Sequence, residues 1–298
     1  MSYHSKSWPM RQFFRFVIWP VEACLMVLIL LPLRLMPAAL AGATTGGILA
    51  FIGPKTKWHT RARQHLNLAL PDLTPAETAE ILHQMWWNLG RNLGEYQHID
   101  RFMEKGWVTI KGRENLDAAK SGGFVVGAHL GNWEIIPYPP TLNDQQIGVV
   151  YRPMNNPYAS LIFKLRGRNP RIQTYEKGRP AALGMLKTIQ QKNIMVLLTD
   201  QQLREGVEAP FFGKNVATPA AHIKIAQKYQ VPIIPTRIRR LGPARIEVHF
   251  QAPVYVPKDA PDHVITDYAR QFNQIFEDWI KDDPSQWLWP HRRWGKDI

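Results

Sequence analysis

The sequence predicts an α/β fold: a mixed, mostly parallel sheet flanked by helices, with an N-terminal membrane-anchoring helix. Short apolar runs alternate with segments of helical periodicity, as in sheets that carry helices on both faces. The 298 residues contain no Ser/Gly/Pro-rich linker and no internal repeat, which favours one large domain. A long apolar stretch near the N-terminus predicts the anchor. We therefore divide the chain into a membrane-anchor segment at 1–53 and a catalytic domain at 54–298.

The anchor is an apolar stretch from Phe13 to Leu33, interrupted by Arg15, Glu22 and two prolines. It is just long enough to span a bilayer, which takes about 20 residues, and Glu22 makes it a poor free-standing span. We expect a helix that either spans the bilayer or lies obliquely in it. Apolar character resumes over residues 38–52, which favours an anchor over a cleaved signal peptide. We expect this second stretch to pack on the domain or to dip into lipid.

A basic run with one tryptophan follows the anchor. Its residues are Lys55, Lys57, Trp58, Arg61 and Arg63. Such a run is usually a solvated face. Because this one comes directly after an apolar anchor, attraction to an anionic membrane surface is an equally good interpretation.

The next element is a helix that begins at Thr74. Thr74 is placed to cap the helix, Pro75 to take its first position and Glu77 to complete a capping box. Apolar residues then recur at helical spacing, and we interpret them as core contacts: Leu82, Met85, Trp86, Leu89, Leu93 and Tyr96.

Five apolar runs in the rest of the chain are expected to be strands: 124–126, 147–150, 194–198, 233–235 and 246–250. Helix starts are expected after Gly178 and at Thr218, and a last amphipathic helix is expected around Phe272. Ligand sites in open α/β sheets gather at the carboxyl ends of the strands. Three polar residues follow three of these strands, so we expect them at one edge: His129, Arg152 and Asp200.

Composition indicates an anionic partner. The chain has 37 Lys and Arg against 24 Asp and Glu, a formal charge of +13 and a pI near 9.9. Nucleic acid, anionic lipid and an acidic carrier protein all fit. The 11 tryptophans favour a membrane interface, and no nucleic-acid recognition module is present, so we expect no nucleic acid partner. The lone cysteine, Cys24, is interpreted as a packing residue. Without a HExxH pattern or a cysteine cluster, we expect no metal and no cofactor.

The stretch with the clearest chemistry is Gly127-Ala128-His129-Leu130-Gly131-Asn132-Trp133-Glu134, directly after the apolar run 124–126. On one continuous helix His129 and Glu134 would be rotated by about 140° from each other, too far to share a face. If the strand ends near His129 and Gly131 makes a turn, Glu134 can fold back beside the imidazole. A base held by a carboxylate is what proton abstraction from an alcohol requires. The alternative is a buried structural histidine with a solvent-facing glutamate.

The His-x4-Glu spacing resembles the His-x4-Asp/Glu box of the lysophospholipid/glycerolipid acyltransferase superfamily. The fuller string resembles its lipid A branch, the late lauroyl and myristoyl acyltransferases. Several stretches agree with this branch in order along nearly the whole chain: 150–153, 156–157, 166–169, 199–202, 211–213, 217–218 and 291–294.

The resemblance implies an enzyme of the bacterial inner membrane, with its catalytic domain on the cytoplasmic side. Such an enzyme transfers a fatty acyl chain from an acyl carrier protein thioester to a hydroxyl of a lipid A precursor, the secondary acylation of lipopolysaccharide biosynthesis. It implies His129 and Glu134 as the catalytic pair, with Arg166 and Asp200 also needed for activity, and we expect both of these to bind substrate. Since arginine binds phosphate bidentately, Arg166 and Arg168 suit the phosphates of a glycolipid acceptor, and we group Arg152 with them.

Several alternatives stay open. The lipid acceptor could instead be a lysophosphatidic acid, a phosphatidylinositol mannoside or an ornithine lipid, or the chain could be a non-catalytic basic membrane-binding protein. No Gly-x-Ser-x-Gly elbow is present, which favours direct attack by the acceptor hydroxyl over a covalent acyl-enzyme. The developing oxyanion could be bound by backbone N–H groups near Gly131 and Asn132 or by an arginine. We interpret the tail, Trp287 to Trp294, as an interfacial or headgroup-binding segment, with a packed C-terminus as the competing interpretation.

Overall fold

A computed structural model describes residues 8–154, 156–158, 160, 169–261 and 263–295. Its centre is a seven-stranded sheet of order β1-β9-β8-β2-β5-β3-β4, in which all neighbouring pairs are parallel except β8 and β9. The predicted mixed, mostly parallel sheet is therefore confirmed. The strands are β1 Val108–Lys111, β2 Gly123–Gly127, β3 Ile147–Tyr151, β4 Ile172–Glu176, β5 Ile194–Leu198, β8 Ile233–Gly242 and β9 Arg245–Phe250. A separate antiparallel ribbon pairs β6 Val207–Phe211 with β7 Lys214–Thr218.

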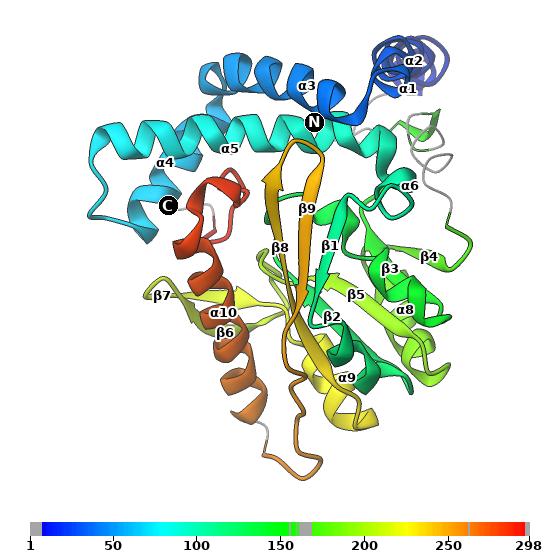
Figure 1. Ribbon diagram of the computed structural model, residues 1–298, viewed down its shortest axis with the longest axis vertical. Coiled ribbons are helices and arrows are strands. Elements are labelled where there is room, and N and C mark those ends of the chain that lie inside the picture. Colours follow the sequence, from blue (N-terminus) through cyan, green and yellow to red (C-terminus); the bar gives the residue numbers. More distant parts are fainter. Residues whose placement is uncertain (1–7, 155, 159, 161–168, 262, 296–298) are drawn as a thin grey trace.

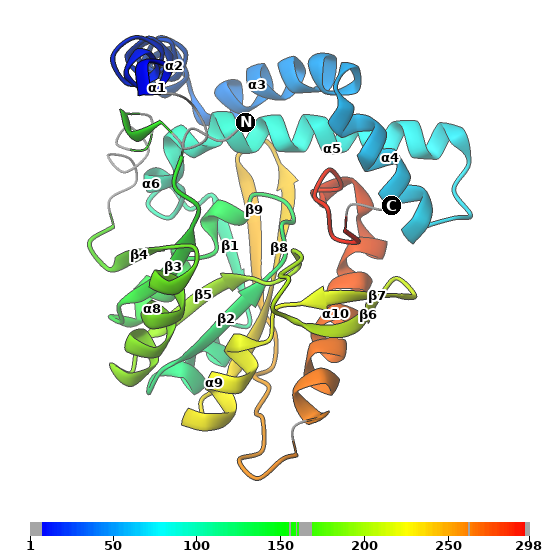
Figure 2. The same cartoon turned by 180° about the vertical axis from the view of Figure 1, so that it is seen from behind.

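Helices surround this sheet (Figures 1 and 2). Their bounds are α1 Trp8–Phe13, α2 Trp19–Leu35, α3 Ala38–Ile52, α4 Lys57–Ala69, α5 Pro75–Glu95, α6 Ile99–Phe102, α8 Arg179–Gln190, α9 Ala221–Tyr229 and α10 His263–Asp282. In both views α3 and α5 lie side by side across one end of the sheet, and α10 runs beside the β6–β7 ribbon. The predicted capping box at the start of α5 is confirmed, because Thr74 and Glu77 bond each other's backbone N–H groups. The start predicted at Thr218 is wrong, since α9 begins at Ala221.

Strand β2 separates two hydrophobic cores. Phe124 and Val126 pack into one core and Val125 into the other, as the two-residue period of a strand requires. All five residues of β2 are buried, which explains why it appears in the sequence as a continuous apolar run. Because β2 is held between the two cores, the position of its carboxyl end is fixed.

The core on the Phe124 side contains a titratable residue, His222 of α9. Its ring lies between Phe124 and Phe272, and its Nε2 atom has no hydrogen-bond partner among the described residues. Burial lowers the pKa of His222 from the ordinary 6.5 to about 3. The folded protein therefore keeps this imidazole neutral, and its contribution to stability is complete above about pH 6.5 and is lost as the pH falls toward about 3.

We expect His222→Leu to flatten the acid side of the stability profile. Between pH 6.5 and pH 4.5 the wild type should lose up to about 1.4 kcal/mol of unfolding free energy per pH unit through this residue. The variant should lose correspondingly less. Chemical denaturation at both pH values measures the difference, and groups shared by both proteins cancel. Parallel profiles would contradict this account of His222.

Helices α3 and α5 approach each other closely because both carry glycines. A Cβ atom on Gly90 would lie 2.3 Å from the Thr45 backbone oxygen, and one on Gly94 would lie 2.3 Å from the Ala41 oxygen. Helix α3 thus packs on the domain, which is one of the two alternatives predicted for residues 38–52. Its exposed apolar residues, Leu40, Ile48, Phe51 and Ile52, leave the other face open. The boundary at residue 53 stays a prediction.

Gly90→Ala is expected to destabilise the fold by about 1–3 kcal/mol, because the new methyl group meets backbone that cannot rotate away. The cost should appear although alanine is favoured over glycine in a helix by about 1 kcal/mol. Gly47→Ala is the matched control, since the nearest atom to its Cβ is a Trp87 ring carbon at 3.7 Å. The control should be neutral or slightly stabilising in the same denaturation experiment. Equal stabilities of the two variants would contradict the close seating of α3 on α5.

The predicted anchor forms helix α2, and the stretch Phe14–Leu35 is long and apolar enough to cross a membrane. Polar contacts tie α2 to the body: Arg34 binds both carboxylate oxygens of Asp100 at 2.8 and 2.9 Å, and the Asn156 amide donates to Glu22 at 3.0 Å. Glu22, the acidic residue within the apolar stretch, thus has a partner. Cys24 is exposed on α2, so its interpretation as a packing residue is wrong.

Candidate active site

His129 follows the carboxyl end of β2, and Asp200 follows the neighbouring parallel strand β5. The pairing of Gly127 with Leu198 sets these two strand ends side by side. The Asp200 carboxylate binds His129 twice: Oδ2 accepts from the His129 backbone N–H at 2.9 Å, and Oδ1 lies 2.7 Å from the ring Nδ1. The imidazole is therefore held in position and orientation by one buried carboxylate.

Asp200 is suited to stay ionised in this position. Burial acts to raise its pKa, but the charge of His129 and the donors from His129 and Trp287 outweigh burial, and the pKa lies below its usual value. The Trp287 indole N–H donates to Oδ2 at 2.8 Å. An ionised Asp200 assigns the ring proton of His129 to Nδ1, which leaves the lone pair on Nε2.

The Nε2 side of His129 faces the side chain of Gln201, whose amide nitrogen lies 3.1 Å away. The His129 side chain is 15% exposed, so the imidazole is only partly covered. The Trp133 ring covers another edge of the imidazole, with ring centroids 5.2 Å apart. A hydroxyl that displaced the Gln201 amide would meet the Nε2 lone pair directly.

Glu134 does not contact His129 in the way the sequence predicted. Its Oε1 accepts a hydrogen bond from the Trp133 indole N–H at 3.0 Å, and the described hydrogen bonds of the His129 ring go to Asp200 and Gln201. The orienting contact expected of Glu134 is made by Asp200, which we had expected to bind substrate. Burial raises the pKa of Glu134, and its bond with Trp133 partly offsets this rise. Glu134 is thus hydrogen-bonded to the indole that packs on the imidazole, and it interacts with His129 itself through charge.

The turn after His129 is tightly held. Gly131 adopts a positive φ of 52°, and an added Cβ would lie 3.1 Å from Gln286 Oε1, so glycine is favoured here. The Gly131 N–H donates to the Gln286 backbone oxygen at 3.1 Å. Of the two backbone donors that the sequence offered for an oxyanion, Gly131 is therefore occupied.

The C-terminal tail closes over this turn and is packed. The Leu288 N–H donates to the His129 oxygen at 3.2 Å, and Leu130 forms a β-bridge with Trp287. Trp287, Trp289 and Trp294 are buried. Arg293 is also buried and donates to Ala217 O, Thr218 Oγ1 and Asn273 Oδ1. The packed-C-terminus interpretation is therefore the correct one for these residues.

Of the three predicted arginines, Arg152 alone lies in the described part of the chain. Arg152 follows β3 and is exposed, and Arg166 and Arg168 lie outside the described residues. Trp287 and Gln201 were missed as members of the site. The string Thr199-Asp200-Gln201-Gln202 gave a signal for Gln201, but nothing local to Trp287 indicates its contact with Asp200.

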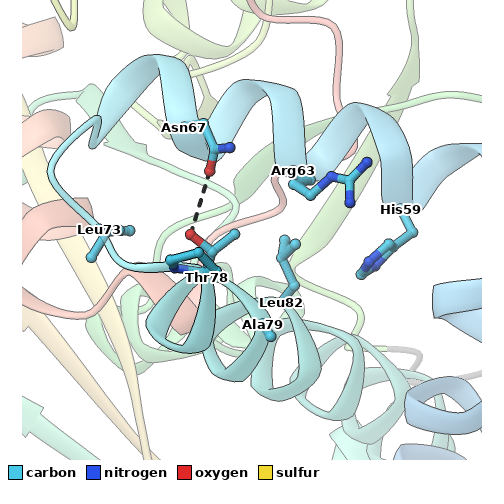
Figure 3. A pocket seen from close by; sticks show the side chains of 8 residues that line it. His59, Arg63, Asn67, Leu73, Thr78, Ala79 and Leu82 are labelled. Atoms are coloured by element: carbon cyan, nitrogen blue, oxygen red, sulfur yellow. Dashed lines mark hydrogen bonds between the residues drawn. The ribbon is translucent and has the colours of Figure 1, made fainter.

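A groove of about 260 Å³ between α4 and α5 is distinct from the His129 site. Figure 3 shows His59, Arg63 and Asn67 along α4, with Thr78 of α5 bonded to Asn67. None of its lining residues belongs to the His129 site. Among the described residues, no group of three or more His, Cys, Asp or Glu side chains could hold a metal ion.

The chain is similar to a protein family, to a curated relative and to a solved structure. The family model described as bacterial lipid A biosynthesis acyltransferase matches residues 4–296. The lipid A biosynthesis lauroyltransferase of Escherichia coli (strain K12) is 24% identical over 245 residues, which cover 77% of this chain and 76% of that protein. The solved structure of the 1-acyl-sn-glycerophosphate acyltransferase from Thermotoga maritima aligns with 85% of this chain and 100% of its own, with 12% identity and a TM-score of 0.39.

Proposed function

The chain belongs to the bacterial lipid A biosynthesis acyltransferases, and from this premise we propose that it transfers a fatty acyl chain from an acyl carrier protein thioester to a hydroxyl of a lipid A precursor. Acyl transfer in lipid A biosynthesis follows from the family. The donor, the acceptor hydroxyl and the catalytic residues are the proposal. The observation that carries it is the partly exposed His129 imidazole, held on Nδ1 by buried Asp200 with Nε2 facing the Gln201 amide.

In the proposed reaction, Nε2 of His129 removes the proton of the acceptor hydroxyl as its oxygen attacks the thioester carbonyl. Asp200 keeps the Nδ1 proton in place and stabilises the imidazolium that forms. The tetrahedral intermediate then collapses, the C–S bond breaks, and the imidazolium gives its proton to the departing thiolate. The products are a new ester and the free carrier thiol. Glu134 supports the site through Trp133, which it holds against the imidazole.

Binding of the acceptor, the carrier protein and the membrane is assigned to groups other than His129 and Asp200. Arg152, Arg166 and Arg168 are proposed to bind the phosphates of the glycolipid acceptor by bidentate hydrogen bonds. The charge of +13 supports docking of an acidic carrier protein and an anionic membrane surface. Helix α2 and the exposed apolar face of α3 support attachment to the inner membrane, with the catalytic domain on the cytoplasmic side where the carrier thioester is made available.

The test uses detergent-purified protein, a labelled acyl carrier protein thioester and a tetra-acylated lipid A precursor. Acylated product, identified by chromatography and mass spectrometry, is the expected result. Parallel reactions offer lysophosphatidic acid, a phosphatidylinositol mannoside and an ornithine lipid. If only one of these lipids is acylated, that lipid replaces the lipid A precursor as the proposed acceptor. A stable acyl-enzyme found by intact mass with donor alone would overturn direct attack. Absence of product with every acceptor would favour the membrane-binding protein.

A further inference from the structure

A buried polar network lies behind the turn that follows His129. Helix α5 contributes Asn88, Asn92 and Glu95, which are spaced four and three residues apart and so share one face. Their exposed fractions are 7%, 4% and 0%. Strand β8 contributes Arg240, which directly precedes an irregularity in the pairing of β8 with β9.

Arg240 joins the three α5 residues. Its Nε donates to Asn88 Oδ1 at 2.6 Å, one terminal nitrogen donates to Asn92 Oδ1 at 2.6 Å, and the other binds Glu95. Its backbone N–H donates to Gln286 Oε1 at 2.7 Å. The planar guanidinium matches three acceptors at once, which a lysine ammonium on a single stem would not reproduce.

The network ends on the turn beside the catalytic base. Asn92 Nδ2 donates to the Gly131 oxygen at 2.6 Å, and Asn132 Nδ2 donates to Glu95 Oε2 at 2.9 Å. Gln286, bonded to the Arg240 backbone, accepts the Gly131 N–H. Both residues after Leu130 are therefore fixed by groups from α5, β8 and the C-terminal tail.

We propose that Asn92, Glu95 and Arg240 are positioning residues for acyl transfer, an inference that rests on the proposed function. They hold the Gly131–Asn132 turn so that His129 remains on Asp200 and presents Nε2 to the acceptor hydroxyl. None of the three contacts His129. A buried ion pair is in general a weak source of stability compared with apolar packing, so geometry at the turn is the better account of this costly arrangement.

The first variant is Asn92→Ala, which removes the bonds to Gly131 and to one terminal nitrogen of Arg240 and leaves the Glu95–Arg240 pair in place. Displacing reacting groups by about 1 Å can cost a hundredfold in rate, so we expect kcat to fall by roughly 10- to 100-fold. The KM for carrier thioester and lipid acceptor should stay within about threefold, because binding groups are untouched. Rates are measured well below the melting temperature, so that loss of folded protein does not enter.

Asn115→Ala is the matched control. Asn115 also donates to a backbone carbonyl, that of Phe250 at 2.8 Å, but at a place that does not involve the turn after His129. Its kcat should stay within about twofold of wild type. Arg240→Lys is the second variant if Asn92→Ala does not fold, with Arg237→Lys on the same strand as its control, since Arg237 pairs with Asp282 instead. Arg240→Lys should lower kcat in the same range.

A second readout does not depend on turnover. The low-field proton resonance of His129 Nδ1–H, assigned by its loss in His129→Ala, should shift or broaden in Asn92→Ala and stay unchanged in Asn115→Ala. A folded Asn92→Ala with wild-type kcat and an unchanged resonance would overturn the inference, as would an equal loss in the control. If wild type forms no product, the proposed function fails instead, and the resonance alone decides the inference.

Discussion

His129→Ala is expected to lower the rate of acyl transfer by at least about a hundredfold, because positioned general bases contribute about 10²- to 10⁴-fold. The alanine variant has no group that could take the hydroxyl proton at this place. The measurement is initial rate with saturating carrier thioester and lipid acceptor. The KM values should change little, since the base acts on the transition state.

His83→Ala, an exposed histidine on α5, is the control and should retain wild-type rates. The melting temperatures of all three proteins show whether the loss is chemical or structural. Turnover by a folded His129→Ala at the wild-type rate would keep the enzyme but remove the base from the mechanism.

Asp200→Asn is expected to lower the same rate by roughly 10²- to 10⁴-fold. The amide can turn its NH₂ toward Nδ1, which places the ring proton on Nε2 and removes the lone pair that accepts the hydroxyl proton. Loss of the negative charge also leaves the imidazolium without its partner. Because the Asp200 pKa lies below its usual value, the carboxylate is ionised throughout the neutral range, and the wild-type activity should show no titration of Asp200 there.

Glu134→Gln is the matched comparison, since it removes the charge of the other nearby carboxylate while an amide oxygen can still accept the Trp133 N–H. Its loss should be about tenfold or less. A larger loss in Glu134→Gln than in Asp200→Asn would return the orienting role to Glu134 and contradict the assignment made from the geometry.

The parts of the fold that the sequence predicted are those governed by local rules. The buried strand before His129, the turn at Gly131 and the capping box at Thr74 each depend on residues within a few positions. The alternation of strands and helices predicted the sheet class, and the strand ends predicted that His129 and Asp200 share an edge.

The assignment of the carboxylate could not be made in this way. It depends on the pairing of β5 with β2, which brings Asp200 to His129 across 71 positions of chain. Spacing within the His-x4-Glu box favoured Glu134 because only local geometry was available. The same limit hid Trp287, whose contact with Asp200 requires the tail to fold back over the turn.

The buried network was also beyond sequence reasoning, although its α5 residues have helical spacing. Asparagine and glutamate on a helix ordinarily indicate its solvent face. Arg240, from a distant strand, offsets the cost of burying them, because Asn88 Oδ1, Asn92 Oδ1 and Glu95 Oε1 each accept a hydrogen bond from its guanidinium.

The unequal attachment of α2 and α3 bears on how the enzyme can be handled in solution. Helix α2 is joined to the body by partly exposed contacts such as the ion pair of Arg34 with Asp100. Ion pairs at the surface contribute little stability. Helix α3 packs closely on the face of α5 where Gly90 and Gly94 lack side chains. A chain shortened to begin at Pro37 would lack α2, which belongs to the stretch long and apolar enough to cross a membrane. It would keep α3 packed on α5. A chain shortened to begin at residue 54 would also lack α3 and would expose that face of α5 to water. A shortened chain for a detergent-free preparation should therefore begin between α2 and α3.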